Sequence, residues 1–212
     1  MPHLLGAERG PEEEGLARLR LLTDTGAIAC RLHPTTEGDA AVLWVFGAGG
    51  GFGGPAGGLY TRLGRQLRPQ GVLSLELAWR QPGRFGPCLT DLFVGLDWLA
   101  AEGRERVVLV GHSFGGAVVI TAGAAREEVV GVAALSSQSA GTDLAGALAP
   151  RPLLLVHGLD DEVLPADCSR DIHARAAEPK DLILYPGCRH GLDECRDELD
   201  RDLMGWLSEV LG

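Results

Sequence analysis

The sequence lacks the basic character of several classes of binding protein. Among its 212 residues only Lys180 is a lysine, and 29 acidic residues outnumber 19 lysines and arginines, which gives a formal net charge of −10. Proteins that bind nucleic acids or anionic membranes generally present a basic face. The charge balance therefore argues against both partners and favours a soluble protein.

Cysteines are also few, and no segment has the pattern of a secretion signal. The five cysteines are odd in number and widely spread, unlike the disulfide framework of a small secreted protein. Residues 1–14 have no apolar core and are rich in glutamate, so they do not form a signal peptide. We therefore expect a cytoplasmic protein with reduced, inert thiols. Cys188 and Cys195 flank His190 and could alternatively pair or bind a metal with it, although their spacing fits no common zinc pattern.

One window, residues 107–125, has no charged side chain and is long enough to span a bilayer. Its centre contains three glycines together with His112 and Ser113. A buried strand, a turn and a buried helix explain this composition better than a membrane helix does. We therefore expect no membrane partner.

The composition predicts a globular α/β protein. Hydrophobic residues make up 45% of the chain and charged residues 23%, and the length corresponds to one domain. Aliphatic runs predict strands over residues 18–22, 28–32, 40–46, 72–79, 107–110, 129–135, 153–157 and 182–185. Helical spacing or apolar composition predicts helices over residues 57–68, 89–102, 114–125, 166–177 and 194–211. We expect a flexible arm over residues 1–15. Residues 16–212 should form a single α/β domain, a mostly parallel twisted sheet of about eight strands with helices on both faces.

Ligands of an open parallel sheet collect at the carboxyl ends of its strands, so the segments that follow the predicted strands are informative. Gly111-His112-Ser113-Phe114-Gly115 lies between a strand and a helix, the context that the G-x-S-x-G nucleophile elbow requires. A tight turn strains the serine and leaves room only for glycine two residues away on either side. Ser113 would then project at the amino end of a helix, whose dipole favours developing negative charge.

A serine hydroxyl needs a base, and the base needs an acid that orients it. Asp161 follows the predicted strand 153–157, and His190 follows the predicted strand 182–185. The chain order Ser113, Asp161, His190 is the order expected for this kind of sheet enzyme. We therefore predict that these residues are nucleophile, acid and base, with Asp160 as the alternative acid.

These segments resemble the α/β-hydrolase superfamily, in particular its small branch of serine esterases that are similar to dienelactone hydrolase. The resemblance rests on residues 111–116, 157–165 and 185–191 and covers about residues 18–211. It implies an α/β-hydrolase fold, and it assigns the acid to the fifth position of H-G-x-x-D, which is Asp161 here. Dienelactone hydrolases proper have a cysteine in the elbow, whereas this chain has Ser113.

The resemblance also implies an oxyanion hole made of two backbone N–H groups, because the tetrahedral intermediate carries a negative oxygen. One donor is Phe114. The other comes from the loop of residues 46–51, with Ala48 as the first choice and Gly49 as the next. Many relatives have histidine-glycine where this chain has Phe46 and Gly47.

The rim of the predicted site includes residues that follow other strands. We expect the substrate to contact Gly49, Trp79, Arg80 and Gln138, with Phe85 nearby, although a packing role for Trp79 is equally open. A lid would be inserted after the strand 129–135, but residues 136–152 are enough only for a loop and a short helix. The sequence therefore predicts an open cleft without a cap domain.

Taken together, the sequence predicts a serine hydrolase that cleaves esters or thioesters of small acyl groups through an acyl-enzyme, without metal or cofactor. A peptidase or acyltransferase of the same fold remains an alternative, as does a non-catalytic module that binds small molecules. Residues 49–54 formally fit G-x-G-x-x-G, with Glu76 after them, which is the outline of a dinucleotide site, but a glycine run makes this match weak. We expect His112 and His157 to be structural or supporting residues with hydrogen bonds near the elbow.

Overall fold

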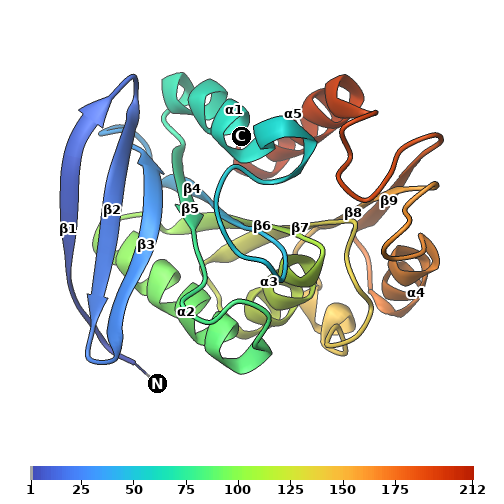
Figure 1. Cartoon of the computed structure of the whole chain (residues 1–212), viewed down its shortest axis with the longest axis horizontal. Helices are drawn as coiled ribbons and strands as arrows, with labels where there is room; N and C mark the ends of the chain where they lie inside the picture. The colour runs from blue at the N-terminus through green and yellow to red at the C-terminus, as the bar shows by residue number, and fades with distance from the viewer. Residues whose placement is uncertain (1) are drawn as a thin grey trace.

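A computed structural model describes residues 2–212, which form one sheet of nine strands with helices on both faces (Figure 1). The order of the strands across the sheet is β1-β2-β3-β5-β4-β6-β7-β8-β9. The strands are β1 (Leu4–Glu13), β2 (Leu16–Thr23), β3 (Gly26–His33), β4 (Ala40–Val45), β5 (Leu73–Leu77), β6 (Arg106–His112), β7 (Val129–Leu135), β8 (Leu153–Gly158) and β9 (Lys180–Tyr185). The helices are α1 (Pro55–Leu67), α2 (Phe85–Ala101), α3 (Phe114–Ala125), α4 (Asp167–Arg175) and α5 (Arg196–Leu211), with short 3₁₀ turns η1 (Arg68–Gln70) and η2 (Ala145–Leu148).

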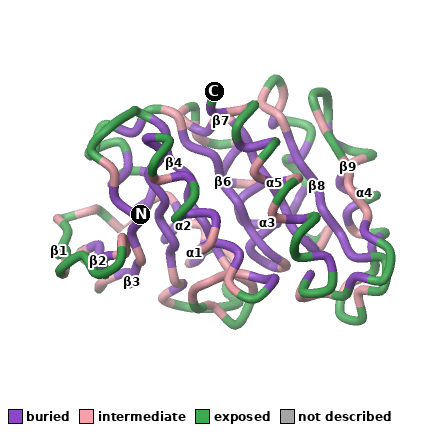
Figure 2. Tube along the Cα trace, turned by 90° about the horizontal axis from the view of Figure 1, so that it is seen from above, coloured by how far each residue is buried: buried purple, intermediate pink, exposed green. Residues whose placement is uncertain are grey.

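Strands β4 to β9 pair in parallel, whereas β1, β2, β3 and β5 pair as antiparallel neighbours. The central strands are buried on both faces, as Figure 2 shows, because helices cover both sides. In β4, Leu43 and Val45 join the core beneath α2, α3 and α4, while Val42 and Trp44 join the core beneath α1 and α5. The predicted mostly parallel sheet with helices on both faces is therefore confirmed.

The prediction of a flexible arm over residues 1–15 is wrong, because Leu4–Glu13 form the edge strand β1. This strand pairs with β2 in an antiparallel ladder, for example Ala7 opposite Leu21. Every residue of β1 is exposed or only partly buried. Backbone hydrogen bonds to β2 hold most of this strand in place, and only its first residue, Leu4, packs against the core, so its sequence shows no hydrophobic alternation.

The apolar window of residues 107–125 falls into β6, a turn and α3, as predicted. Among the described residues, no helix has the length and apolarity needed to cross a bilayer. Residues 136–152, between β7 and β8, contain only a loop and the short turn η2. No cap domain covers the carboxyl ends of the strands in the part of the chain that the structure describes.

Cys188 and Cys195 form a disulfide, which corrects the prediction of reduced thiols at these positions. The turn after β9 folds back to the start of α5 and brings the two Cα atoms to 5.8 Å, a distance that suits a disulfide. Sequence spacing alone does not show such a turn, and the prediction rested on the expected compartment. Cys30, Cys88 and Cys168 are free.

Arg80, just after β5, joins three elements through its guanidinium group. Its Nε and Nη2 atoms lie 2.7 and 2.6 Å from Asp91 Oδ1 in α2, and its Nη1 atom lies 2.8 Å from Thr25 Oγ1 in the β2–β3 turn. The Asp91 side chain is only 1% exposed. Removing one partner of such a buried ion pair leaves the other charge without compensation.

We predict that Asp91→Asn lowers the free energy of unfolding by about 3 kcal/mol, because it leaves the largely buried Arg80 charge without its acidic partner. Guanidinium chloride unfolding measures this change. The matched control is Asp97→Asn, since Asp97 forms an ion pair with Arg126 but is 48% exposed, and it should cost less than about 1 kcal/mol. Equal losses in the two variants would contradict the structural role of the Arg80–Asp91 pair.

We also predict that the protein, denatured without reductant, reacts with iodoacetamide at three cysteines, namely Cys30, Cys88 and Cys168. Intact mass gives the number of alkylated thiols. Treatment with dithiothreitol before alkylation should add Cys188 and Cys195. Full alkylation of all five cysteines without reductant would argue against the disulfide.

Candidate active site

Ser113 lies in the sharp turn between β6 and α3, so the predicted strand, turn and helix are all present. Its backbone has φ 56° and ψ −121°, a sparsely populated conformation for a residue with a side chain. The turn closes because glycines flank it. A Cβ atom on Gly111 would collide with the carbonyl oxygen of Gly115, and one on Gly115 would lie 2.5 Å from the carbonyl oxygen of Phe46.

The structure brings His190 and Asp161 to Ser113 from two other strand ends. The Nε2 atom of His190 lies 3.0 Å from Ser113 Oγ, and its Nδ1 atom lies 2.7 Å from Asp161 Oδ2. The Asp161 side chain is fully buried, while His190 is 15% exposed. The three predicted residues thus form a hydrogen-bonded chain from the partly exposed Ser113 to a buried carboxylate.

Asp161 is bound more extensively than its neighbour Asp160. Its Oδ1 atom accepts hydrogen bonds of 2.8 Å from the backbone N–H groups of Val163 and Leu164. Burial alone would raise the pKa of Asp161, but the hydrogen bonds from Leu164, His190 and Val163 outweigh it and hold that pKa below its usual value. Asp160 is exposed, and only its backbone N–H takes part in the loop, donating to the carbonyl oxygen of Cys188. The geometry therefore favours Asp161 as the acid.

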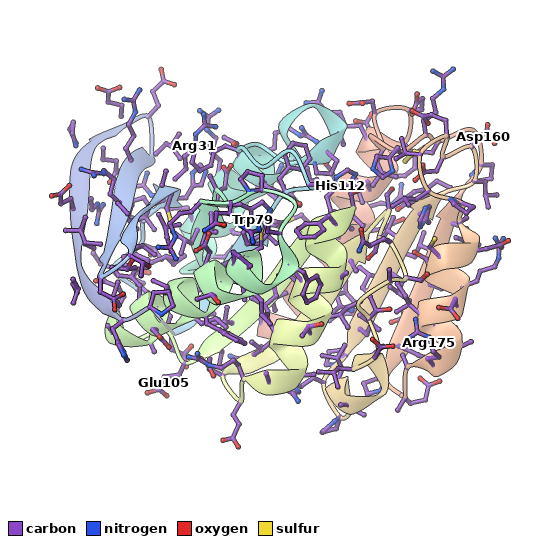
Figure 3. The ribbon with its side chains drawn as sticks, turned by 60° about the horizontal axis from the view of Figure 1, so that its bottom comes forward. Arg31, Trp79, Glu105, His112, Asp160 and Arg175 are labelled. Carbon is purple, nitrogen blue, oxygen red and sulfur yellow. A yellow bond between two sulfur atoms is a disulfide. The ribbon has the colours of Figure 1, made fainter. Side chains whose placement is uncertain are left out.

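His112 connects the elbow to the loop that carries His190. Figure 3 places His112 at the opposite end of the sheet from Glu105, which precedes β6, and so at the carboxyl end of that strand. Burial lowers the pKa of His112 to about 4, which keeps the ring neutral at pH 7. Its Nε2 atom lies 2.9 Å from the His190 carbonyl oxygen, which can only accept, so Nε2 donates. The predicted supporting role of His112 agrees with this contact.

The predicted oxyanion groups belong to two segments that adjoin Ser113. Phe114 is the first residue of α3, where backbone N–H groups have no acceptor within the helix. In the other segment, the Gly50 N–H donates to the Gly47 carbonyl oxygen at 3.0 Å and closes a turn with the exposed residues Ala48 and Gly49 at its tip. A Cβ atom on Gly47 would lie 3.4 Å from Ser113 Cβ, so this turn runs directly against the serine.

A buried carboxylate anchors the glycine-rich segment that continues from this turn. Glu76 is 1% exposed, and its carboxylate accepts hydrogen bonds of 2.7 Å from the Gly53 N–H and from Thr61 Oγ1. A dinucleotide site would need this carboxylate free for a ribose hydroxyl. The contacts of Glu76 therefore argue against the dinucleotide alternative. Within residues 2–212, no cluster of three or more His, Cys, Asp or Glu side chains could hold a metal ion.

The predicted substrate-binding residues differ in their placement. Trp79 is 5% exposed and donates from Nε1 to the Phe46 carbonyl oxygen at 3.1 Å, so it packs against the segment that leads into the turn of residues 47–50. The guanidinium of Arg80 is engaged with Asp91, Thr23 and Thr25, which supports a structural role in place of a substrate contact. Gln138 follows β7 and donates to the Ala140 carbonyl oxygen. A substrate contact for Gln138 and Gly49 stays a prediction.

Two contacts of the site lie outside the sequence prediction. Glu162 Oε2 accepts the backbone N–H of His190 at 3.3 Å, and His157 Nε2 lies 3.1 Å from Asp161 Oδ2. The only signal for the second contact is the four-residue spacing of His157 and Asp161 in one motif. Nothing in the sequence marks Glu162, because its partner is a backbone group of a distant loop.

Comparison with known proteins identifies the family of this chain. Residues 51–203 match the model of the dienelactone hydrolase family. The Escherichia coli (strain K12) protein YfhR, described as uncharacterized, is 34% identical over 98 residues, which are 45% of this chain and 33% of YfhR. The match thus spans about a third of the length of that relative.

Solved structures share the fold. The esterase domain of a Rhodothermus marinus protein superposes with a TM-score of 0.76 at 19% identity, over 93% of this chain and 99% of that one. Est1E from Butyrivibrio proteoclasticus gives a TM-score of 0.70 at 18% identity, over 96% of this chain and 98% of that one. These superpositions confirm the predicted α/β-hydrolase fold. Since the family match covers most of the chain and includes Ser113, Asp161 and His190, the protein belongs to the dienelactone hydrolase family.

Proposed function

We propose that this hydrolase cleaves carboxylic esters or thioesters of small acyl groups, with Ser113 as nucleophile, His190 as base and Asp161 as acid. The observation that carries the proposal is the continuous chain from Ser113 Oγ through the His190 ring to the Asp161 carboxylate, with links of 3.0 and 2.7 Å. Such a chain turns a weakly nucleophilic hydroxyl into a strong nucleophile. The strained backbone of Ser113 adds support, because strain of this kind concentrates at functional sites.

In this mechanism Ser113 Oγ attacks the carbonyl carbon of the ester while its proton passes to His190 Nε2. Asp161 holds the ring orientation and stabilises the imidazolium. The backbone N–H groups of Phe114 and Ala48 hold the negative oxygen of the tetrahedral intermediate. When the intermediate collapses, the C–O or C–S bond breaks and the leaving group takes the proton from His190. Water then gives a proton to His190 and attacks the acyl carbon. The bond between that carbon and Ser113 Oγ breaks, Oγ takes the proton back from His190, and the acid is released.

The surroundings of Ser113 favour small or flexible substrates. The segment between β7 and β8 contributes only a loop and one short turn, so no inserted domain closes over the serine. The turn of residues 47–50, which carries the proposed oxyanion donor, is exposed at Ala48 and Gly49. A panel of p-nitrophenyl esters of increasing acyl length, together with acyl-CoA thioesters, defines the preference. Because Est1E has been solved with ferulic acid bound, a feruloyl ester belongs in the panel.

We predict that Ser113→Ala lowers turnover of p-nitrophenyl acetate by about 10⁶-fold, as loss of the nucleophile does in serine proteases. The matched control is Ser208→Ala, which removes a hydroxyl that bonds only to the Met204 carbonyl oxygen on the exposed face of α5 and should leave turnover unchanged. Wild-type turnover in Ser113→Ala would refute the mechanism.

A fluorophosphonate probe separates the alternatives from the proposal. It should label Ser113 in the wild-type protein and leave the Ser113→Ala variant unlabelled. Folded wild-type protein without an adduct would favour a non-catalytic binding module. Labelling without ester turnover would favour a peptidase or acyltransferase. Thermal stabilisation by NAD(P), which the hydrolase does not predict, would favour a dinucleotide site.

We further predict that activity on a short-chain triglyceride rises smoothly with concentration through the solubility limit of the substrate. The physical reason is that the described residues include no inserted lid that a lipid surface would have to open. Initial rates by pH-stat titration measure this dependence. A sharp jump of the rate at the solubility limit would indicate a closed site and contradict the open cleft.

A further inference from the structure

The side chain of His157 is fully buried at the end of β8 and lies against the same carboxylate oxygen as His190. Its Nε2 atom is 3.1 Å from Asp161 Oδ2 and 3.1 Å from the carbonyl oxygen of Leu164. His190 Nδ1 lies 2.7 Å from that same Oδ2 atom. Two imidazole rings therefore share one oxygen of the proposed acid.

The neighbours of His157 determine which of its ring nitrogens carries the hydrogen. Nε2 faces two acceptors, the Leu164 carbonyl oxygen and the Asp161 carboxylate, so Nε2 must be the N–H. Nδ1 then accepts from the buried hydroxyl of Ser169 in α4, 2.7 Å away. Burial lowers the pKa of His157 below its usual value, so the ring is neutral at pH 7.

We propose that His157 is a positioning residue that holds Asp161 in place for its hydrogen bond with His190. Its Nε2–H donates to the Leu164 carbonyl oxygen, and the Leu164 N–H donates to Asp161 Oδ1, so His157 holds the loop that carries the acid. The same N–H dipole supports negative charge on Oδ2. Because the ring is neutral, it does so without competing with His190 as a second cation would. This role rests on the proposed function of Asp161 and His190.

Removal of the His157 ring should act on His190 through the loop that carries Asp161. The titratable groups that face the loop and ring of His190 are Asp161, Glu162 at its backbone N–H, and His112, whose ring centroid is 4.8 Å away. Of these, Asp161 depends on His157, because the residue whose carbonyl oxygen accepts from His157, Leu164, also donates its N–H to Asp161 Oδ1. Without the His157 N–H this loop loses one of its hydrogen bonds, Asp161 is held less firmly against His190 Nδ1, and turnover falls.

The test is an NMR measurement of the imidazole ¹⁵N and ¹H signals of the full chain at pH 7, with His190→Gln and His157→Gln used for assignment, together with ester kinetics. In the wild-type protein, His157 should be neutral at pH 7 with its hydrogen on Nε2. In His157→Phe, kcat/KM for p-nitrophenyl acetate should fall roughly 10- to 100-fold, mainly through kcat. His157→Gln, whose amide nitrogen can take the place of Nε2, should restore kcat toward the wild-type value.

Ser169→Ala is the matched control from the same buried pocket. It removes the partner of Nδ1, but Nε2 still faces its two acceptors and keeps its hydrogen. This variant should lose thermal stability, as His157→Phe does, and yet keep kcat for p-nitrophenyl acetate close to the wild-type value.

Three results would overturn the proposal: an Nδ1–H tautomer of His157, a protonated His157 at pH 7, or equal losses of kcat in Ser169→Ala and His157→Phe. The tautomer is measured in the wild-type protein, so a misfolded His157→Phe variant does not remove the test. The NMR measurement also requires no turnover. A protein that hydrolyses none of the esters would therefore refute the proposed function and still give a separate answer for His157.

Discussion

The parallel alignment of strands β4 to β9 is the constraint on which the rest of the site depends. It brings the carboxyl ends of β6, β8 and β9 to one edge of the sheet, and the backbone ladder continues past the ends of the strands. The Ser113 N–H donates to the Leu135 carbonyl oxygen, and the Leu159 N–H donates to that of Tyr185. The loops that carry Ser113 and Asp161 therefore begin in a register that the sheet has already determined.

The loop that carries His190 has no such regular support, and contacts from its neighbours hold it instead. His112 binds its backbone from the elbow, and Glu162 binds it from the acid loop. The Ala56 N–H donates to the Gly191 carbonyl oxygen at 2.7 Å, which ties it to the glycine-rich segment. The disulfide between Cys188 and Cys195 closes the loop around His190. The position of His190 is thus determined by the elements that surround it.

Local sequence was sufficient to predict features whose physical cause is local. The aliphatic runs of the central strands follow from burial on both faces, and the glycines at 111 and 115 follow from the sterics of the elbow. Motif context also placed Asp161 next to His190. Features that depend on distant partners were not predictable: the disulfide needs the fold of the turn after β9, and the engagement of Arg80 needs Asp91 from α2. The contact of Glu162 could not be predicted either, because its partner is the backbone N–H of His190 in a distant loop.

The edge strand β1 has a consequence for the way in which one molecule meets another. An open sheet presents a row of free N–H and C=O groups along each edge strand, which is a template for a strand from a second chain. Here that row is interrupted, because register shifts fall between Leu4 and Gly6 and between Arg9 and Glu12, and Pro11 offers no N–H. Charged side chains occupy much of the rest of the strand. The edge strand β1 therefore offers a second chain no continuous row of backbone groups with which to pair. This arrangement protects the protein against edge-to-edge aggregation.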